Sequence, residues 1–222
     1  SVALAEQGAN VTGIDIDKKA LDFAKKRANI YKQKINFVYS NATEINKLKN
    51  KNWDIIIYFA SLEHMTPNER KNSLKQAFEL IDNGKHICIF GTPNRLWPID
   101  EHTSQIPFYM WLQDEIAIDY AKFSKRTEFS KISSDQNKKE FTDLYRWGRG
   151  VSFHEIQSAL NDDSEIKIID SLPIFLQRFS FLQKISYKRS LEYNYKSVIS
   201  KMGPDKIHPG FYERYLDLII EK

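Results

Sequence analysis

The sequence predicts an α/β fold built around a mostly parallel β-sheet, and three features predict it. Short apolar runs typical of buried strands alternate with helical segments up to Asn94. The run Trp53–Phe59 is almost entirely apolar, as expected of a strand covered on both faces. A carboxylate, Asp15, follows another predicted strand directly, and open parallel sheets bind their ligands at such strand ends.

Helix caps and apolar runs predict the helices and strands at the start of the chain. We expect a helix that ends at Gly8, then a buried strand that ends at Asp15. A second helix begins at Asp17, and residues 35–39 form a short strand before the strand at 53–59. A helix that leads into a strand with an acidic end is typical of the second half of a nucleotide-binding βαβ unit.

Two capping boxes place the next helices. Thr66 and Glu69 frame one helix start with Pro67 in the first turn, and Ser152 and Glu155 frame another. We expect the first of these helices to end near residues 83–84. The remaining expected elements are strands at 85–91, 165–170 and 215–220, and a partly helical, aromatic-rich tail at 172–201.

The alternation of predicted strands and helices stops between Arg95 and Gly150. Proline and tryptophan cluster first, an amphipathic stretch follows around residues 108–123, and a polar loop follows near 130–139. Such a segment is typical of an insertion or lid. We therefore divide the chain into a ligand-binding part at 1–94, a lid at 95–150, and the rest of the main domain at 151–222.

Composition narrows the function classes. The chain has 33 Lys and Arg against 29 Asp and Glu, and the lysines are scattered, so nothing supports nucleic-acid binding. Its only cysteine, Cys88, lies in an apolar run, which excludes an internal disulfide and favours a reducing compartment, here the cytoplasm. No apolar stretch reaches membrane-spanning length.

The chemistry is expected at the carboxyl ends of the strands. Asp15 and Ile16 follow the first of them, and Asn41 and Ala42 follow the second. A carboxylate for ribose hydroxyls, an apolar residue for one adenine face and an amide for the base edge together predict an adenosine pocket. The third and fourth ends carry residues 59–64 and 92–95.

Residues 11–17, 37–42 and 53–65 together resemble the class I S-adenosylmethionine-dependent methyltransferases. Within this family they are similar to the branch resembling the ubiquinone-pathway O-methyltransferases, whose motif after the strand ends in Leu-Glu-His, here Leu62 to His64. The resemblance implies a Rossmann-like seven-strand sheet with a reversed last strand, which would account for 215–220. The first strand and the glycine-rich motif of the family are absent from the chain, so we expect a fragment of a longer protein that folds poorly alone.

The resemblance also implies roles for single residues. Asp15 would hold the ribose hydroxyls of S-adenosylmethionine, Ile16 would pack on adenine, and Asn41 with Ala42 would meet the base edge, where the family usually has Asp. Phe59 and Ala60 would line the methionine side. The ubiquinone-type relatives carry a further Glu where this chain has Ala60, so the sequence assigns no metal ligands.

The sequence predicts the binding site of the methyl acceptor in less detail than that of the cofactor. His64 or His102 would act as general base on an acceptor hydroxyl, because histidine titrates near neutrality. The rings of Trp97, Phe108, Tyr109 and Trp111 would wall the acceptor pocket. The expected reaction is methyl transfer to an oxygen, or else a nitrogen or carbon, of a small molecule or glycan precursor (EC 2.1.1.-); the oligomeric state is not predicted.

Plainer interpretations remain open for the same residues. Asp15 can simply end a strand, Asn41 can be a turn residue, and His64 can hydrogen-bond the backbone. His102 can fix a loop together with Asp100 or Glu101. Two other functions also remain open: a nicotinamide-dependent dehydrogenase, which also uses an acid at a strand end, and a non-catalytic protein that binds a nucleotide or a partner.

Overall fold

The structure is a computed structural model of the chain. It describes residues 1–48, 52–134, 141–160, 165–168, 177, 180–203, 205 and 207–222. The chain forms two compact units, Ser1–Asn52 and Trp53–Lys222, and each is described by itself.

The first unit is a small α/β unit. Helix α1 (Val2–Glu6) leads into strand β1 (Thr12–Asp15), helix α2 (Lys18–Ile30), strand β2 (Asn36–Tyr39) and a 3-10 segment, η1 (Ala42–Leu48). Strands β1 and β2 pair in parallel, with Asp15 opposite Tyr39. The parallel βαβ arrangement expected for this region is confirmed.

Local caps define the ends of these helices. Gly8 follows α1 with a φ of 88°, a left-handed conformation that glycine adopts without steric cost. Asp17 caps α2, where its carboxylate accepts the Lys19 N–H at 2.8 Å. The buried residues Leu21 and Ala28 of α2, with Ile45, form the small apolar interior of the unit.

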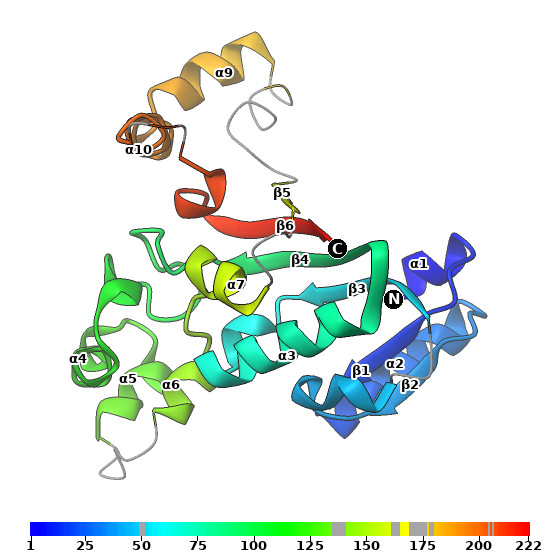
Figure 1. The fold of residues 1–222 in the computed structure, drawn as a ribbon. Coiled ribbons are helices and arrows are strands. Elements are labelled where there is room, and N and C mark those ends of the chain that lie inside the picture. Colours follow the sequence, from blue (N-terminus) through cyan, green and yellow to red (C-terminus); the bar gives the residue numbers. More distant parts are fainter. Residues whose placement is uncertain are drawn as a thin grey trace. The chain divides into compact units, whose positions relative to one another are not determined.

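The second unit contains a four-stranded mixed sheet in the order β3-β4-β6-β5 (Figure 1). Strand β3 (Trp53–Phe59) runs parallel to β4 (Ile81–Pro93). Strand β6 (Tyr215–Glu221) runs antiparallel to both β4 and β5 (Glu165–Ile168). The α/β prediction and the reversed last strand are therefore confirmed, whereas the described residues form six strands in two sheets.

The start of β4 corrects the expectation from the sequence. Helix α3 (Pro67–Leu80) ends before residues 83–84, and β4 already begins at Ile81, which pairs with Trp53. Gly84 has a φ of 76° and donates its N–H to the Lys222 carbonyl at 2.7 Å. The Asn-Gly pair therefore marks a bend within the strand, because the pairing with neighbouring strands outweighs the local turn signal.

Helices α3 and α7 (Phe153–Ala159) lie on the same side of this sheet (Figure 1). Both expected capping boxes are present at their starts. Leu74 from α3 and Ile156 from α7 are fully buried against the sheet residue Leu218. Each such side chain contributes about 1.5–3 kcal/mol through burial, so this layer is the core of the unit.

Residues between β4 and α7 form a second apolar cluster. Its buried members are Tyr109, Ala117, Ile118, Ala121, Phe129 and Leu144. The elements that carry them are η3 (Tyr109–Trp111), α4 (Asp114–Tyr120), η4 (Ala121–Phe123), α5 (Thr127–Ser130) and α6 (Thr142–Arg146), and Ile132 of η5 (Lys131–Ser134) packs against the cluster. Within the polar loop expected near 130–139, residues 131–134 form η5, whereas 135–139 lie outside the described residues.

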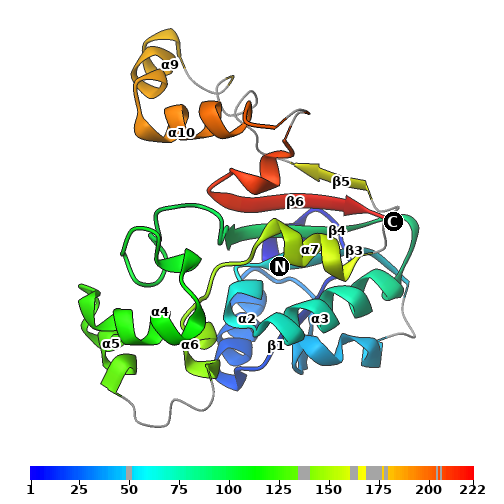
Figure 2. The same cartoon turned by 60° about the vertical axis from the view of Figure 1, so that its left-hand side comes forward.

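Between β5 and β6 the described residues form α9 (Phe181–Lys188) and α10 (Leu191–Ile199), followed by η6 (Pro209–Phe211). Figure 2 shows α9 and α10 side by side. Lys196 of α10 is buried and donates to Glu213 at 2.6 Å. The tail is helical in its described part, whereas 169–176 lie outside the described residues.

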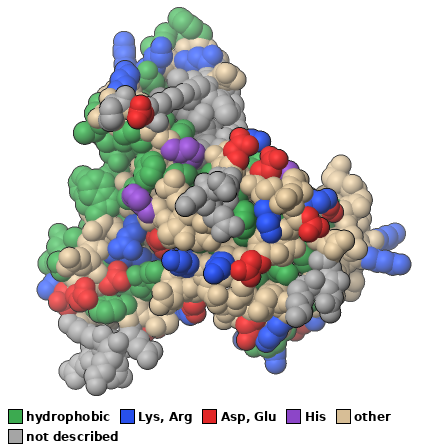
Figure 3. All heavy atoms as spheres, viewed as in Figure 1, with side chains coloured by type: hydrophobic (Ala, Val, Ile, Leu, Met, Phe, Trp, Pro, Cys, Tyr) green, Lys and Arg blue, Asp and Glu red, His purple; other side chains and the backbone are tan. Residues whose placement is uncertain are grey.

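The surface carries charges of both signs. On the face shown in Figure 3, Lys and Arg side chains are interspersed with Asp and Glu. None of the helices in the described part of the chain is both long and apolar enough to cross a membrane.

Candidate functional site

In the first unit, Asp15 and Ile16 lie at the carboxyl end of β1. The Ser40 N–H donates to the Asp15 carbonyl at 3.2 Å, which brings the end of β2 beside them. The Asp15 side chain is exposed, and its Oδ1 accepts the Asp17 N–H at 2.8 Å. Ile16 is 60% exposed, and other large apolar side chains of this unit, such as Phe23, are exposed as well.

Asn41 and Ala42 follow β2 at the same edge. The Asn41 Oδ1 accepts the Thr43 N–H at 3.0 Å, so the interpretation of Asn41 as a turn residue is confirmed. A carbonyl oxygen has two lone pairs and the amide NH₂ two protons, so this turn leaves Asn41 able to bind a ligand.

The residues at this edge fit an adenosine group. An exposed carboxylate accepts from vicinal hydroxyls, an exposed isoleucine offers an apolar face, and an amide both donates and accepts. All three belong to neighbouring ends of one parallel pair, β1 and β2. The donor and acceptor set of this edge therefore matches ribose and a purine base.

In the second unit, Phe59 and Ala60 lie at the end of β3. Phe59 is 73% exposed, and Ala60 adopts a φ of 45° while its N–H donates to the Phe90 carbonyl at 2.9 Å. A left-handed conformation costs a residue with a Cβ about 1–2 kcal/mol. The structure maintains this strain where strand β3 turns into the segment that carries Glu63 and His64.

The structure brings Glu63 and His64 together with His102. The ligand atoms of these three side chains all lie within 4.8 Å of one another, and the two imidazole rings are 5.7 Å apart between centroids. Glu63 and His64 belong to η2 (Leu62–His64), whereas His102 follows β4 in the segment assigned to the lid. The two histidines predicted as general base, His64 and His102, therefore lie in the same cluster.

Glu63 is the acidic member of this cluster. Its side chain is fully buried, and among the described residues neither carboxylate oxygen has a hydrogen-bond partner. The His64 Nε2 lies 3.9 Å from Oε1, beyond hydrogen-bond distance. Burial raises the pKa of the Glu63 carboxyl, and the positive charges of His64, when protonated, and of Arg70 oppose this shift without cancelling it.

Hydrogen bonds fix the proton positions on both histidines. The His64 Nδ1 lies 2.9 Å from the Arg146 carbonyl, which can only accept, so Nδ1 carries the proton. The His102 Nδ1 lies 3.0 Å from the Thr103 hydroxyl, whose own proton goes to the Gly148 carbonyl at 2.6 Å. Both rings therefore keep a free lone pair on Nε2 when they are neutral.

Gly148 allows His102 to take this position. Its φ is 111°, and a Cβ added there would lie 2.7 Å from the His102 ring. Burial lowers the pKa of the His102 imidazole, and the neighbouring His64 lowers it further. The backbone N–H of His102 also donates to Asp100 at 3.1 Å, as the interpretation of His102 as a loop-fixing residue expected.

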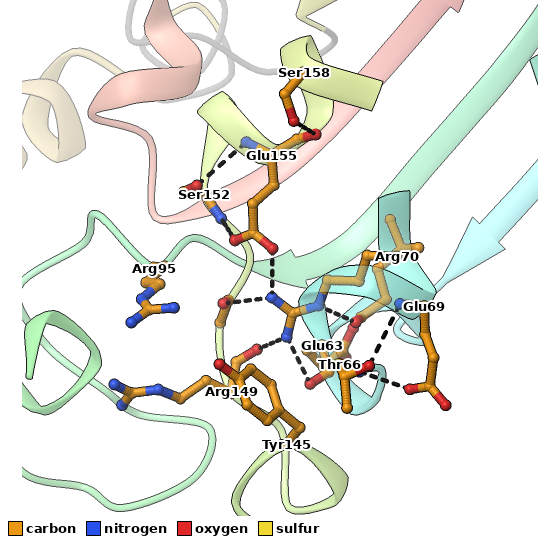
Figure 4. A network of polar contacts seen from close by, with 12 residues as sticks. Glu63, Thr66, Glu69, Arg70, Arg95, Tyr145, Arg149, Ser152, Glu155 and Ser158 are labelled. Atoms are coloured by element: carbon orange, nitrogen blue, oxygen red, sulfur yellow. Dashed lines mark hydrogen bonds and ion pairs between the residues drawn. The ribbon is translucent and has the colours of Figure 1, made fainter. Parts of the chain in front are cut away.

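Arg70 holds the Glu63 segment in place (Figure 4). Its side chain is fully buried and donates to the carbonyls of Leu62 at 2.8 Å, Glu63 at 3.2 Å and Gly150 at 3.2 Å. It also donates to the Arg149 carbonyl, and it forms an ion pair of 2.9 Å with Glu155. The sequence analysis missed this residue; its spacing of four positions before the buried Leu74 is the signal that Arg70 lies on the inward face of α3.

The four rings of the expected aromatic wall differ in exposure, and Trp97 lines a small pocket together with Asp100 and His102. Trp97 and Tyr109 are buried at 6% and 1% exposure, where Trp97 packs against Tyr195 and Tyr109 against Phe129. These two large rings therefore contribute apolar area to the interior of the unit. Phe108 and Trp111 are about half exposed and pack edge to face, with centroids 4.9 Å apart.

We predict that the Glu69–Arg146 ion pair makes stability depend on acid pH. Arg146 donates to both Glu69 oxygens, at 2.7 and 2.9 Å, and lowers the pKa of Glu69 to about 2. That value lies below the unfolded pKa of about 4.3, so the stabilisation is complete above about pH 5 and is lost as the pH falls toward 2. Because Arg146 is 43% exposed, we discount the effect to about 1–2 kcal/mol.

Glu69→Gln is the matched variant, because glutamine at this position still completes the capping box. Denaturant unfolding from pH 6 to pH 2.5 should show a smaller loss of stability in the variant than in the wild type. Parallel curves would contradict the role of the pair.

Residues 1–84 match the family model described as "Methyltransferase domain". The chain is 30% identical over 169 residues to a ubiquinone biosynthesis O-methyltransferase of Coxiella burnetii, over 76% of this chain and 68% of that protein. It is 28% identical over 137 residues to the protein of the same name from Nitrosospira multiformis, over 61% of this chain and 56% of that protein.

Among solved structures, the chain is similar to a SAM-dependent methyltransferase from Archaeoglobus fulgidus. The TM-score is 0.46 and the sequence identity 16%, over 100% of this chain and 80% of the other.

Proposed function

Because the chain belongs to the class I S-adenosylmethionine-dependent methyltransferases, we propose that it transfers the methyl group of this cofactor to an oxygen of a small molecule or glycan precursor. The oxygen as target is supported by the relatives from Coxiella burnetii and Nitrosospira multiformis, which are named O-methyltransferases. The acceptor itself is proposed only as a class.

The cofactor is S-adenosylmethionine, which supplies a methyl group already activated on a positively charged sulfur. In our proposal the Asp15 carboxylate accepts hydrogen bonds from the ribose hydroxyls, and Ile16 packs on the adenine ring. Asn41 and Ala42 meet the base edge. Phe59 and Ala60 line the side of the methionine part.

We assign the acceptor to the segment 95–150 and to the His64–His102 pair. A neutral imidazole with a free Nε2 lone pair can take the proton of an acceptor hydroxyl. The lowered pKa of His102 keeps its ring in that basic form at neutral pH. Since the methyl group is already activated, holding the acceptor oxygen in line with the sulfur supplies much of the rate.

The proximity of His64 and His102 is the observation that carries this proposal, because it puts two basic nitrogens beside one acceptor segment. The remaining rings of the wall, Phe108 and Trp111, are exposed on the same segment and offer apolar area to a ring-bearing acceptor.

A methyl-transfer assay tests the proposal. The protein is incubated with S-adenosylmethionine carrying a radiolabelled methyl group and with matched phenol, sugar and amine acceptors. We expect label on hydroxyl-bearing acceptors, and we expect His64→Ala or His102→Ala to lower kcat by about 10²–10⁴-fold. His154→Ala, which removes an exposed histidine of α7, is the control and should keep the wild-type rate.

Transfer to the amine alone would contradict the oxygen assignment. An unchanged kcat in the double variant lacking His64 and His102 would contradict the base assignment, while leaving the methyltransferase family of the chain untouched.

A further inference from the structure

We propose that Arg95 determines which methyl acceptors the protein takes, by binding a carboxylate group on the acceptor. The inference rests on the proposed function, because it names the substrate class of the same acceptor site. Arg95 follows the carboxyl end of β4, where its N–H donates to the Val151 carbonyl at 2.9 Å. Open α/β sheets bind their ligands beyond such strand ends, so this position suits a contact with the substrate.

The first argument is that the Arg95 side chain has hydrogen-bond donors to spare. Its Nε donates to the Met110 carbonyl at 3.0 Å, which holds the guanidinium group in place. Neither Nη nitrogen has a hydrogen-bond partner within the described part of the chain, and Nη2 lies 3.8 Å from the Asp114 Oδ1. The side chain is 26% exposed, so a ligand can reach these nitrogens. Guanidinium donors of this kind match the two oxygens of a carboxylate.

The second argument is the balance of charge around Asp114. Its Oδ2 accepts the hydroxyl proton of Tyr145, and its Oδ1 lies 3.3 Å from the Nε of Arg149. Arg149 is fully buried and depends on this carboxylate as its counter-charge, whereas the partly exposed Arg95 lies farther from it. Two guanidinium groups beside one carboxylate leave one positive charge without a counter-charge.

The third argument is the effect of this excess charge on the buried arginine. The guanidinium groups of Arg95 and Arg149 lie close together (Figure 4). Burial lowers the pKa of Arg149, and the charge of Arg95 lowers it further, while Asp114 opposes both. A carboxylate bound at Arg95 would relieve the repulsion with its single negative charge. A phosphate group carries about −1.5 to −2 charges at pH 7 and would be repelled more strongly by Asp114.

The surroundings of Arg95 suit an acceptor with a ring. Trp111 is half exposed, and its Nε1 donates to the carbonyl of Leu96, the next residue after Arg95, at 3.2 Å. The half-exposed Phe108 packs edge to face against Trp111. Apolar rings beside a cation fit a molecule that combines an aromatic part with a carboxylate.

Arg95 and His102, the proposed base, lie against the two ends of one short segment. A Cβ added at Gly148 would lie 2.7 Å from the His102 ring, and a Cβ added at Gly150 would lie 3.1 Å from the Arg95 backbone. Two residues of chain span about 7 Å at most. We therefore place the reacting hydroxyl and the carboxylate of one small acceptor at His102 and Arg95.

A pair of matched acceptors tests the inference. The protein is saturated with S-adenosylhomocysteine and titrated by calorimetry with 4-hydroxyphenylacetate and with its methyl ester, which keeps the ring and the hydroxyl but removes the charge. Methyl transfer from labelled S-adenosylmethionine to both compounds is measured in parallel. We expect the acid to exceed the ester by about 10–100-fold in affinity and in kcat/KM, the ratio that hydrogen bonds to a charged group provide.

Variants of Arg95 assign this preference to one side chain. Arg95→Gln should remove the preference by weakening the acid alone, because a loosened fold would weaken acid and ester equally. Arg95→Lys keeps the charge without the forked donors and should retain part of the preference. Arg189→Gln is the matched control, since it removes an exposed guanidinium group at the end of α9 and should preserve the wild-type ratio. Circular dichroism verifies that each variant is folded.

The outcomes separate this inference from the proposed function. Equal affinities of the folded wild type for acid and ester, absent binding of the acid, or a preference that survives Arg95→Gln would overturn the inference, even if both compounds are methylated. Tighter binding of 4-hydroxyphenyl phosphate than of the acid would overturn the carboxylate assignment. Selective binding of the acid that depends on Arg95, without any methyl transfer, would support the carboxylate site and contradict the proposed function instead.

Discussion

Replacement of Arg70 by methionine is expected to destabilise the protein by about 3–5 kcal/mol, the cost of removing one partner of a buried ion pair. Arg70 is fully buried, and its guanidinium group donates to four backbone carbonyls and to Glu155. Methionine fills similar space but donates no hydrogen bond. The carbonyls of Leu62 and Gly150 would then remain buried without their partner, and Glu155 would lose its cation.

Denaturant unfolding followed by circular dichroism measures this effect. Lys71→Met is the matched control, since the neighbouring Lys71 is exposed and its replacement should change stability by less than about 0.5 kcal/mol. Arg70→Lys should lie between the two, because an ammonium group cannot serve the forked arrangement of acceptors. An Arg70→Met variant as stable as Lys71→Met would contradict the role assigned to this network.

Replacement of Asp15 by alanine is expected to weaken the binding of S-adenosylhomocysteine by about 100-fold or more. In our proposal the carboxylate accepts two hydrogen bonds from the ribose, and bonds to a charged group contribute about 1.5–3 kcal/mol each. Asp15→Asn should cost less, because the amide oxygen still accepts while the charge is lost. Calorimetric titration of the folded variants provides the affinities.

Asp22→Ala is the control for this comparison. Asp22 lies on α2 in the same unit, is well exposed and pairs only weakly with Lys25 at 3.4 Å. Equal affinities of the Asp15→Ala and Asp22→Ala variants would contradict the ribose assignment, even if the protein still bound the cofactor by other groups.

Helix starts were predictable because their signals are local. Thr66 with Glu69, and Ser152 with Glu155, form the expected capping boxes because each box satisfies backbone N–H groups within a single turn. The strand at 53–59 was predictable for a related reason: its length and apolar composition exceed what a loop tolerates.

The start of β4 was not predictable from the same kind of signal. An Asn-Gly pair ordinarily ends a helix or forms a turn, yet Gly84 bends a continuous strand that pairs with residues far away in the sequence. The pairing partners, Trp53 and Lys222, carry no mark of this contact in their own sequence surroundings. The boundary between α3 and β4 is therefore set by the pairing of β4 with its neighbouring strands and not by the local sequence.

The candidate site likewise has a part that the sequence predicts and a part that it does not. The positions of Asp15 and Asn41 at strand ends were predictable because strand ends are visible in the pattern of apolar runs. The meeting of His64 with His102, and the burial of Glu63, depend on how the segment after β4 folds back. Arg70 was missed because a charged residue is usually exposed, although its spacing of four positions before Leu74 places it on the inward face of α3.

A titration of the wild-type protein with S-adenosylhomocysteine, beside an identical titration with NAD⁺, tests the central claim most directly. Both ligands carry adenosine, so a strand-end carboxylate alone does not distinguish them. A methyltransferase that binds S-adenosylmethionine should bind S-adenosylhomocysteine saturably and NAD⁺ not at all. A folded protein that binds NAD⁺ in preference, or that binds neither ligand, would contradict the account.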